Sequence, residues 1–256
     1  MLRALSEAGI RPDLVVGTSI GAVNGAFVAA DPERAAERLS DLWGGESLGL
    51  VFSETVLGRA VRLARSGTHL HAIEPLEQLL AATLPAENFA DLKLPFHCVA
   101  ASIEDAAARW FSSGPLVPAV MASCAVPGLL PPVEIDGAHY FDGGLVDSIP
   151  VGRAVALGAS CVYVLQVGRI ESPLPVPARP WEVGLVAFEI ARRHRFFEEM
   201  SSLPSGVEVH VLPTGGEQQQ PGLRQFRYRG RNQVSNSIER SYAASASYLA
   251  QVTGSR

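Results

Sequence analysis

Apolar and polar residues follow one another in blocks that predict alternating strands and helices. The apolar run at 14–16 is typical of a strand buried on both faces, and a tight turn at 17–21 leads from it into an apolar helical pattern at 20–30. Further strands are predicted at 96–101, 109–112, 133–141, 160–167 and 207–212, and further helices at 2–8, 31–44, 54–66, 73–83, 115–124, 181–203 and 232–252, with one more that begins near 150. This alternation favours an α/β fold with a mostly parallel sheet.

The segment 171–180 contains four prolines and is expected to be a surface connection, not a domain boundary. We therefore expect one domain over residues 1–256. The longest apolar stretch, 154–168, holds 15 residues. Because roughly 18 to 20 apolar residues are needed to span a bilayer, no membrane-spanning helix is predicted.

Composition and charge narrow the class of protein. A hydrophobic content of 47% with 18% charged residues excludes a disordered chain. The net charge of −5 disfavours a nucleic-acid partner, since such proteins normally carry a positive excess. The three cysteines are too few and too scattered for a disulfide framework or a four-ligand zinc site, so we expect a reducing compartment, the cytoplasm.

The pentapeptide at 17–21 is the strongest candidate for chemistry. It has the G-x-S-x-G pattern of a nucleophile elbow, with a buried strand before it and a helix after it: Gly17, Thr18, Ser19, Ile20 and Gly21. The two glycines are expected because a strained turn brings backbone too close for a Cβ. The turn also places the serine at a helix N-terminus, where free N–H groups stabilise negative charge. The alternative is a glycine-rich turn with a capping serine.

A serine nucleophile needs a base, and the residues alone leave its identity open. His139, His194 and His210 all follow Ser19 in the chain, but each also has an ordinary structural explanation. Asp142 precedes two glycines, Gly143 and Gly144, which allow the backbone to curl and another group to approach the carboxylate closely; a simple turn is the alternative.

Three segments together resemble the patatin-like phospholipases: G-T-S-I-G-A at 17–22, A-S-C-A-V-P-G-L-L-P-P at 122–132 and Y-F-D-G-G-L-V-D-S-I-P-V at 140–151. The resemblance implies a three-layer α/β/α fold over the whole chain. It also implies a catalytic dyad, with Ser19 as nucleophile, Asp142 as base, and no cofactor or metal. The implied activity is hydrolysis of acyl esters of phospholipids or related lipids through an acyl-enzyme.

The family places a first strand and a glycine-rich loop of the type G-G-G-x-x-G before the helix that corresponds to 1–10, and this sequence begins inside that helix. The resemblance implies that backbone N–H groups of that loop form the oxyanion hole. We expect that the true chain starts further upstream and that the Ile20 N–H supplies a remaining donor. The alternative is a catalytically silent lipid- or partner-binding module. An α/β-hydrolase with a histidine triad is disfavoured, because that fold needs several strands before the elbow.

Weaker patterns suggest further contacts. His69, His71 and Glu74 include an H-x-H pair but lack a defined metal-ligand geometry, so no metal is expected. A basic–aromatic stretch is explained by a solvated edge or by contact with anionic lipid: Arg224, Phe226, Arg227, Tyr228, Arg229 and Arg231. The helix at 181–203 mixes aromatic residues with arginines, as interfacial helices do, and core packing explains its aromatics equally well. Peripheral membrane contact thus remains open, as does the oligomeric state.

Overall fold

The fold is known from a computed structural model, which describes residues 1–44, 67–166, 173–216 and 231–253. Two units emerge from the contacts: Asp13–Pro150 forms one, and Met1–Pro12 together with Val151–Arg256 forms the other. The expectation of one domain over residues 1–256 stays a prediction. The helix expected at 54–66 lies outside the described residues.

The unit Asp13–Pro150 is built around a five-stranded sheet with β1 (Val15–Thr18), β2 (Phe96–Ser102), β3 (Ala107–Phe111), β4 (Val133–Ile135) and β5 (Ala138–Asp142). β1 runs parallel to β2, whereas the pairs β2–β3, β2–β5 and β4–β5 are antiparallel. The α/β class with helices flanking a central sheet is confirmed. The expectation of a mostly parallel sheet is wrong for these described strands, because three of their four strand pairs, two of them hairpins, are antiparallel.

One of these hairpins replaces a strand that was expected to be continuous over 133–141. Asp136 and Gly137 both adopt positive φ, 52° and 80°, and they form the two-residue turn between β4 and β5. This is the turn geometry for which Asp-Gly is preferred, because both central residues need φ above zero. The dipeptide was therefore an available signal for the hairpin.

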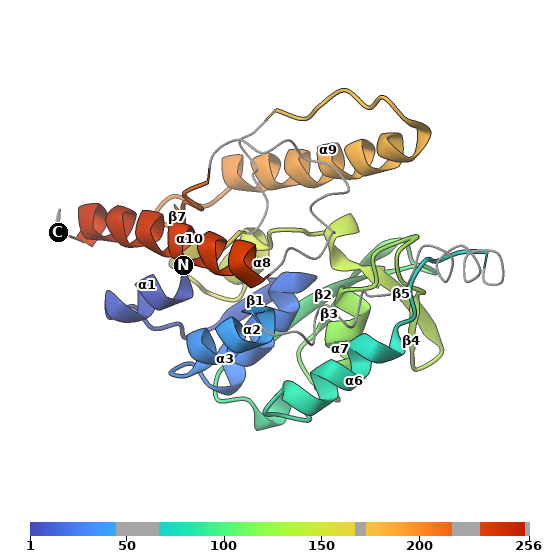
Figure 1. The fold of residues 1–256 in the computed structure, drawn as a ribbon, viewed down its shortest axis with the longest axis horizontal. Helices are drawn as coiled ribbons and strands as arrows, with labels where there is room; N and C mark the ends of the chain where they lie inside the picture. Colours follow the sequence, from blue (N-terminus) through green and yellow to red (C-terminus); the bar gives the residue numbers. More distant parts are fainter. Residues whose placement is uncertain (45–66, 167–172, 217–230, 254–256) are drawn as a thin grey trace. The chain divides into compact units, whose positions relative to one another are not determined.

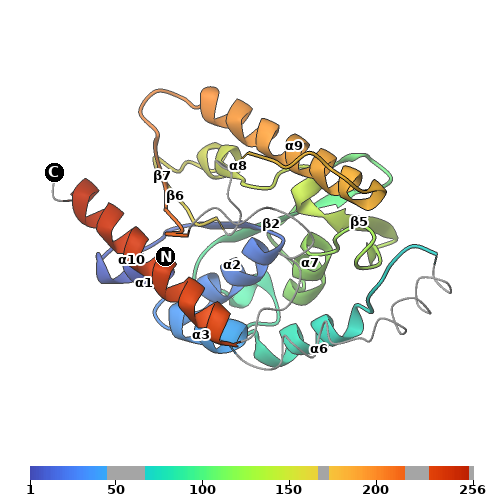
Figure 2. The same ribbon diagram turned by 45° about the horizontal axis from the view of Figure 1, so that its top comes forward.

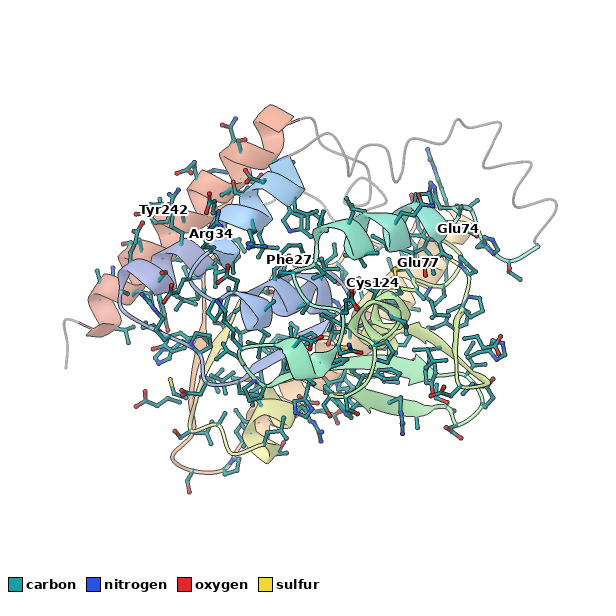
Figure 3. The ribbon with its side chains drawn as sticks, turned by 90° about the horizontal axis from the view of Figure 1, so that it is seen from below. Phe27, Arg34, Glu74, Glu77, Cys124 and Tyr242 are labelled. Atoms are coloured by element: carbon teal, nitrogen blue, oxygen red, sulfur yellow. The ribbon has the colours of Figure 1, made fainter. Side chains whose placement is uncertain are left out.

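Helices of this unit pack on one face of the sheet: α2 (Ile20–Ala30), α3 (Ala35–Gly44), α6 (Glu74–Thr83) and α7 (Leu116–Ser123). Phe27 projects from α2 into the shared core (Figure 3), and Leu80, Leu116 and Val120 are also fully buried there. α2 and α7 lie side by side (Figures 1 and 2). Asp31, expected to start α3, instead ends α2, and its carboxylate pairs with Lys93 at 2.8 Å. Two short 3-10 helices complete this unit, η1 (Phe89–Asp91) and η2 (Gly143–Leu145).

The second unit contains a two-stranded parallel sheet of β6 (Cys161–Val164) and β7 (Glu208–Val211), which lie next to each other in Figure 2. Its helices are α1 (Leu2–Glu7), α8 (Val151–Ala156), α9 (Pro180–Ser201) and α10 (Arg231–Thr253). Its apolar core joins α1, α10 and the residue that follows β7 through Ala4, Leu5, Leu212 and Leu249. Among the described residues, no helix has both the length and the apolar character needed to cross a bilayer.

Candidate active site

Strand β2 brings Ser19 and Asp142 together although 123 positions separate them in the sequence. Along β2, Thr18 of β1 pairs with Val99, and Asp142 of β5 pairs with the next residue, Ala100. Since β3 occupies the other edge of β2 over the same residues, β1 and β5 lie end to end along one edge. The end of β1, and with it the serine that follows, therefore meets the end of β5.

Ser19 lies in a strained turn between β1 and α2. Its backbone has φ 56° and ψ −126°, a conformation that residues with a Cβ rarely adopt. Such strain is typical of residues at functional sites, where the surrounding structure holds the backbone in place. The strand, turn and helix expected for a nucleophile elbow are all present.

The two glycines of the elbow differ in what they contribute. A Cβ on Gly17 would lie 2.3 Å from the Gly21 carbonyl oxygen, so only glycine fits there. A Cβ on Gly21 would meet no atom within 4 Å. The expectation that close backbone approach requires both glycines is therefore correct for Gly17 and wrong for Gly21, because the approach occurs at the strand end and not at the helix start.

Asp142 is buried, with 2% of its surface exposed, and both of its carboxylate oxygens accept hydrogen bonds. The Ser19 hydroxyl donates to Oδ2 at 2.6 Å, and the Gly144 N–H donates to Oδ1 at 2.7 Å. The first distance lies in the range of charge-assisted O–H···O⁻ bonds, about 2.5–2.7 Å. The backbone N–H of Asp142 itself donates to the Ala125 carbonyl at 2.9 Å. The carboxylate is therefore fixed in position against the serine.

The two glycines after Asp142 each have a distinct role. A Cβ on Gly143 would lie 2.1 Å from the Val99 carbonyl oxygen, so this residue allows the chain to pass directly against β2. Gly144 supplies the N–H group that binds Asp142. The expected close approach at this turn is thus present, although the group that approaches Gly143 is the β2 backbone.

Two polar residues in the interior support the elbow. Ser123, fully buried at the end of α7, accepts a hydrogen bond from the Ser19 backbone N–H at 2.9 Å. The Thr18 hydroxyl donates to the Asp147 carbonyl at 2.8 Å, which ties β1 to the segment after η2. Ser123 lies within the motif at 122–132, and the sequence alone predicts no role for it. A polar residue in the apolar helical pattern 116–123 was the available signal.

The N-terminus of α2 presents donors next to the serine. Ile20 and Gly21 are the first two residues of the helix, so their N–H groups have no acceptor inside it. The next two N–H groups, of Ala22 and Val23, bond back to the Ser19 carbonyl at 2.7 and 3.2 Å. The N-terminus of α2 thus has two N–H groups without an acceptor in the helix, and it is the positive end of the helix dipole. Both features favour a negative charge at this place.

Buried thiols next to the site remain protonated. Burial raises the pKa of Cys124 well above its ordinary value, and the charge of Asp142 and the neighbouring Cys98 raise it further. Burial likewise raises the pKa of Cys98. Because the thiolate is the reactive form of cysteine, these two buried thiols are poor candidates for a nucleophile.

None of the hydrogen bonds found for the described residues joins a histidine to Ser19. His139 lies on β5, but its side chain is 44% exposed and its Nδ1 lies 2.8 Å from Glu104. His194 and His210 belong to the second unit, where they lie 3.5 Å from the carboxylates of Glu198 and Glu208 respectively.

The weaker sequence patterns have mixed outcomes. His69, His71 and Glu74 do not form a metal-ligand cluster among the residues that the structure describes, and the His69 Nδ1 lies 3.0 Å from the Thr68 hydroxyl.

The basic–aromatic residues 224–229 lie outside the described range, and Arg231 begins α10. On α9, Phe196 is buried while Phe197 is 53% exposed. Membrane contact through α9 therefore stays a prediction.

The fold and site geometry are those of a nucleophile elbow in an α/β protein. A model of the patatin-like phospholipase family matches residues 1–155, and the chain belongs to this family. It is 29% identical over 184 residues to lysophospholipase nte1 of Aspergillus terreus and 30% identical over 189 residues to lysophospholipase NTE1 of Mycosarcoma maydis.

These alignments cover 68% of this chain, which spans only 11% and 9% of the two relatives. Among solved structures, the chain is similar to VipD from Legionella pneumophila, with a TM-score of 0.41 and 13% identity, over 98% of this chain and 63% of VipD.

Proposed function

We propose that this protein is a lipid acyl-ester hydrolase in which Ser19 is the nucleophile and Asp142 the general base. The observation that carries the proposal is the 2.6 Å hydrogen bond from the Ser19 hydroxyl to the buried Asp142 carboxylate, made from a strained elbow. Family membership and the lysophospholipase relatives support acyl esters of phospholipids or lysophospholipids as the substrate class.

The first half-reaction forms an acyl-enzyme. Asp142 takes the hydroxyl proton as Ser19 Oγ bonds to the ester carbonyl carbon, and the carbonyl oxygen becomes negative. The N-terminus of α2, with the Ile20 N–H, is the donor assigned to that oxygen. Collapse of the tetrahedral intermediate breaks the bond to the alcohol, which leaves with the proton held by Asp142.

The second half-reaction restores the enzyme. Asp142 accepts a proton from water, whose oxygen attacks the acyl carbon, and Ser19 departs and regains its proton from Asp142. The products are the fatty acid and the alcohol. A carboxylate is a weak base at its ordinary pKa, so its fixed position and burial supply the advantage.

Hydrolysis of a lysophospholipid and of a short-chain chromogenic ester by the purified chain tests the proposal. Ser19→Ala is expected to lower kcat by at least about 10³-fold, since removal of a catalytic serine leaves only residual binding effects. The matched control is His139→Ala, which removes an exposed histidine from the same strand as Asp142 and is expected to keep full activity. Equal activity of Ser19→Ala and the wild type, with both folded by circular dichroism, would refute the proposal.

A further inference from the structure

The two parallel strands of the second unit bring three metal-binding side-chain types to one place. Cys161 and Glu208, the first residues of β6 and β7, are paired in register, and Tyr163 pairs with His210 two positions further on. Because side chains two positions apart lie on the same face of a strand, all four face one side of this sheet. The ligand atoms of Cys161, Glu208 and His210 lie within 4.8 Å of one another.

His210 is held in a fixed orientation. Its ring stacks on Tyr163 with centroids 4.8 Å apart and planes 19° from parallel, and Nδ1 lies 3.1 Å from the Tyr248 hydroxyl oxygen. When Nδ1–H donates to that oxygen, the lone pair of the ring is on Nε2. Metal-binding histidines are commonly held in this way through their other nitrogen.

The Nε2 atom of His210 is buried and has no hydrogen-bond partner within the part of the chain that the structure describes. Its contact with Glu208 Oε2 is 3.5 Å, longer than a hydrogen bond. A buried polar atom without a hydrogen-bond partner lowers the stability of the folded protein. In this case the atom lies near the Glu208 carboxylate. A cation bound at Nε2 would satisfy this buried atom.

Cys161 differs from the other two cysteines. It is exposed, whereas Cys98 and Cys124 are buried and burial raises the pKa of both thiols. The Cys161 sulfur is therefore accessible to a metal ion from solvent, whereas the sulfurs of Cys98 and Cys124 are enclosed in the interior.

We propose that Cys161, Glu208 and His210 form a binding site for a zinc-type divalent transition-metal ion, with water completing the coordination. One sulfur, one nitrogen and one oxygen ligand suit Zn²⁺, which binds them at about 2.0–2.3 Å in tetrahedral geometry. Rotation of the exposed Cys161 and Glu208 side chains closes the cluster around the ion, while the stacked His210 stays in place. The ion would join the first residues of β6 and β7.

Cobalt(II) is a suitable probe, because a cobalt–thiolate bond absorbs in the near ultraviolet. Titration of the purified, reduced chain is expected to saturate at one Co²⁺ per chain with a thiolate band that added Zn²⁺ removes. Cys161→Ser is expected to abolish the band although Cys98 and Cys124 remain. Tyr248→Phe, which removes the partner of Nδ1, is expected to weaken Co²⁺ binding by at least about 10-fold.

The matched control is His194→Ala, an exposed histidine on α9 that pairs with Glu198 and is expected to leave Co²⁺ affinity unchanged. The titration is repeated in Ser19→Ala, so its result does not depend on hydrolysis. The absence of saturable binding at one equivalent, or a thiolate band that survives in a folded Cys161→Ser variant, would overturn the proposal.

Discussion

Among the residues that the structure describes, two short hydrogen bonds are of the same chemical type, a hydroxyl that donates to a carboxylate, and they lie in two different units. Ser19 donates to Asp142 at 2.6 Å, and Tyr242 of α10 (Figure 3) donates to Glu7 of α1 at 2.5 Å. Their surroundings differ. Asp142 is 2% exposed, whereas the Glu7 side chain is 53% exposed.

The second pair belongs to a surface network. The Arg3 guanidinium lies 3.5 Å above the Tyr242 ring and binds both carboxylate oxygens of Glu239, at 3.0 and 2.9 Å. Nothing forces the Tyr242 backbone into strain, whereas Ser19 has a φ of 56°. The hydroxyl–carboxylate bond is thus common to both sites, and the proposed role of Ser19 depends on two features that the Tyr242 pair lacks: a buried carboxylate and a strained backbone.

The largest expected difference between the two pairs is in catalysis. Asp142→Asn keeps a hydrogen-bond acceptor but cannot take a proton, so kcat is expected to fall by about 10²- to 10⁴-fold. Glu7→Gln makes the same change in the surface pair and is expected to leave kcat unchanged. Ester hydrolysis under saturating substrate measures both, and an equal fall in the two variants would break the comparison.

The second largest effect is expected on stability, at the glycine that permits the strained turn at Ser19. Gly17→Ala places a Cβ 2.3 Å from the Gly21 carbonyl oxygen and is expected to lower the free energy of unfolding by about 3 kcal/mol, the upper range for overpacking. Gly21→Ala places a methyl group in open space on a helix and is expected to cause no loss of stability. Urea unfolding of both variants checks this, and similar losses at the two positions would contradict the geometry of the elbow.

A smaller effect is expected for the buried serine that holds the Ser19 backbone. Ser123→Ala leaves the Ser19 N–H without its acceptor and is expected to cost about 1–3 kcal/mol of stability, together with a fall in kcat. Ser245 is the matched control in the second unit, because it is also fully buried and donates to the Pro213 carbonyl at 3.1 Å. Ser245→Ala is expected to lower stability without any change in kcat, and the reverse pattern would contradict a positioning role for Ser123.

The smallest effect is expected at the surface pair, in its response to pH. The hydrogen bond to Glu7 and that negative charge raise the pKa of Tyr242 above its ordinary value. Because the folded pKa is the raised one, the contribution to stability is present below the ordinary value of about 10 and is lost as pH rises through the folded value.

Absorbance of tyrosinate against pH measures this, with Tyr242→Phe identifying the signal. Glu7→Gln is expected to move the Tyr242 midpoint to lower pH and to leave the melting temperature at pH 7 nearly unchanged. An unshifted midpoint would show that the surface bond has no effect on titration.

Local sequence was enough to predict the elbow. The strand at 15–18, the turn at Ser19 and the helix at 20–30 depend on residues close together in the chain, so their pattern could be read from the sequence. The hairpin at 133–142 was missed because its alternation continues across Asp136-Gly137, which hides a turn within an apparently single strand.

Long-range contacts set the limit of prediction. Ser123 lies 104 positions from Ser19, and only the packing of α7 beside the elbow shows that its hydroxyl accepts the Ser19 N–H. The residues alone left the base open between Asp142 and three histidines, and the family resemblance singled out Asp142. The pairing of β5 with β2 then gives a physical reason for the proximity of Asp142 and Ser19.

Covalent labelling with a fluorophosphonate tests the role of Ser19 most directly, because this reagent reacts with activated serines and needs no knowledge of the substrate. Intact-mass analysis is expected to show one adduct per chain, mapped by peptide analysis to Ser19, absent in Ser19→Ala and slowed in Asp142→Asn by about 10²-fold or more. A folded wild-type chain that forms no adduct, or forms it at the same rate in Asp142→Asn, would contradict the proposed dyad.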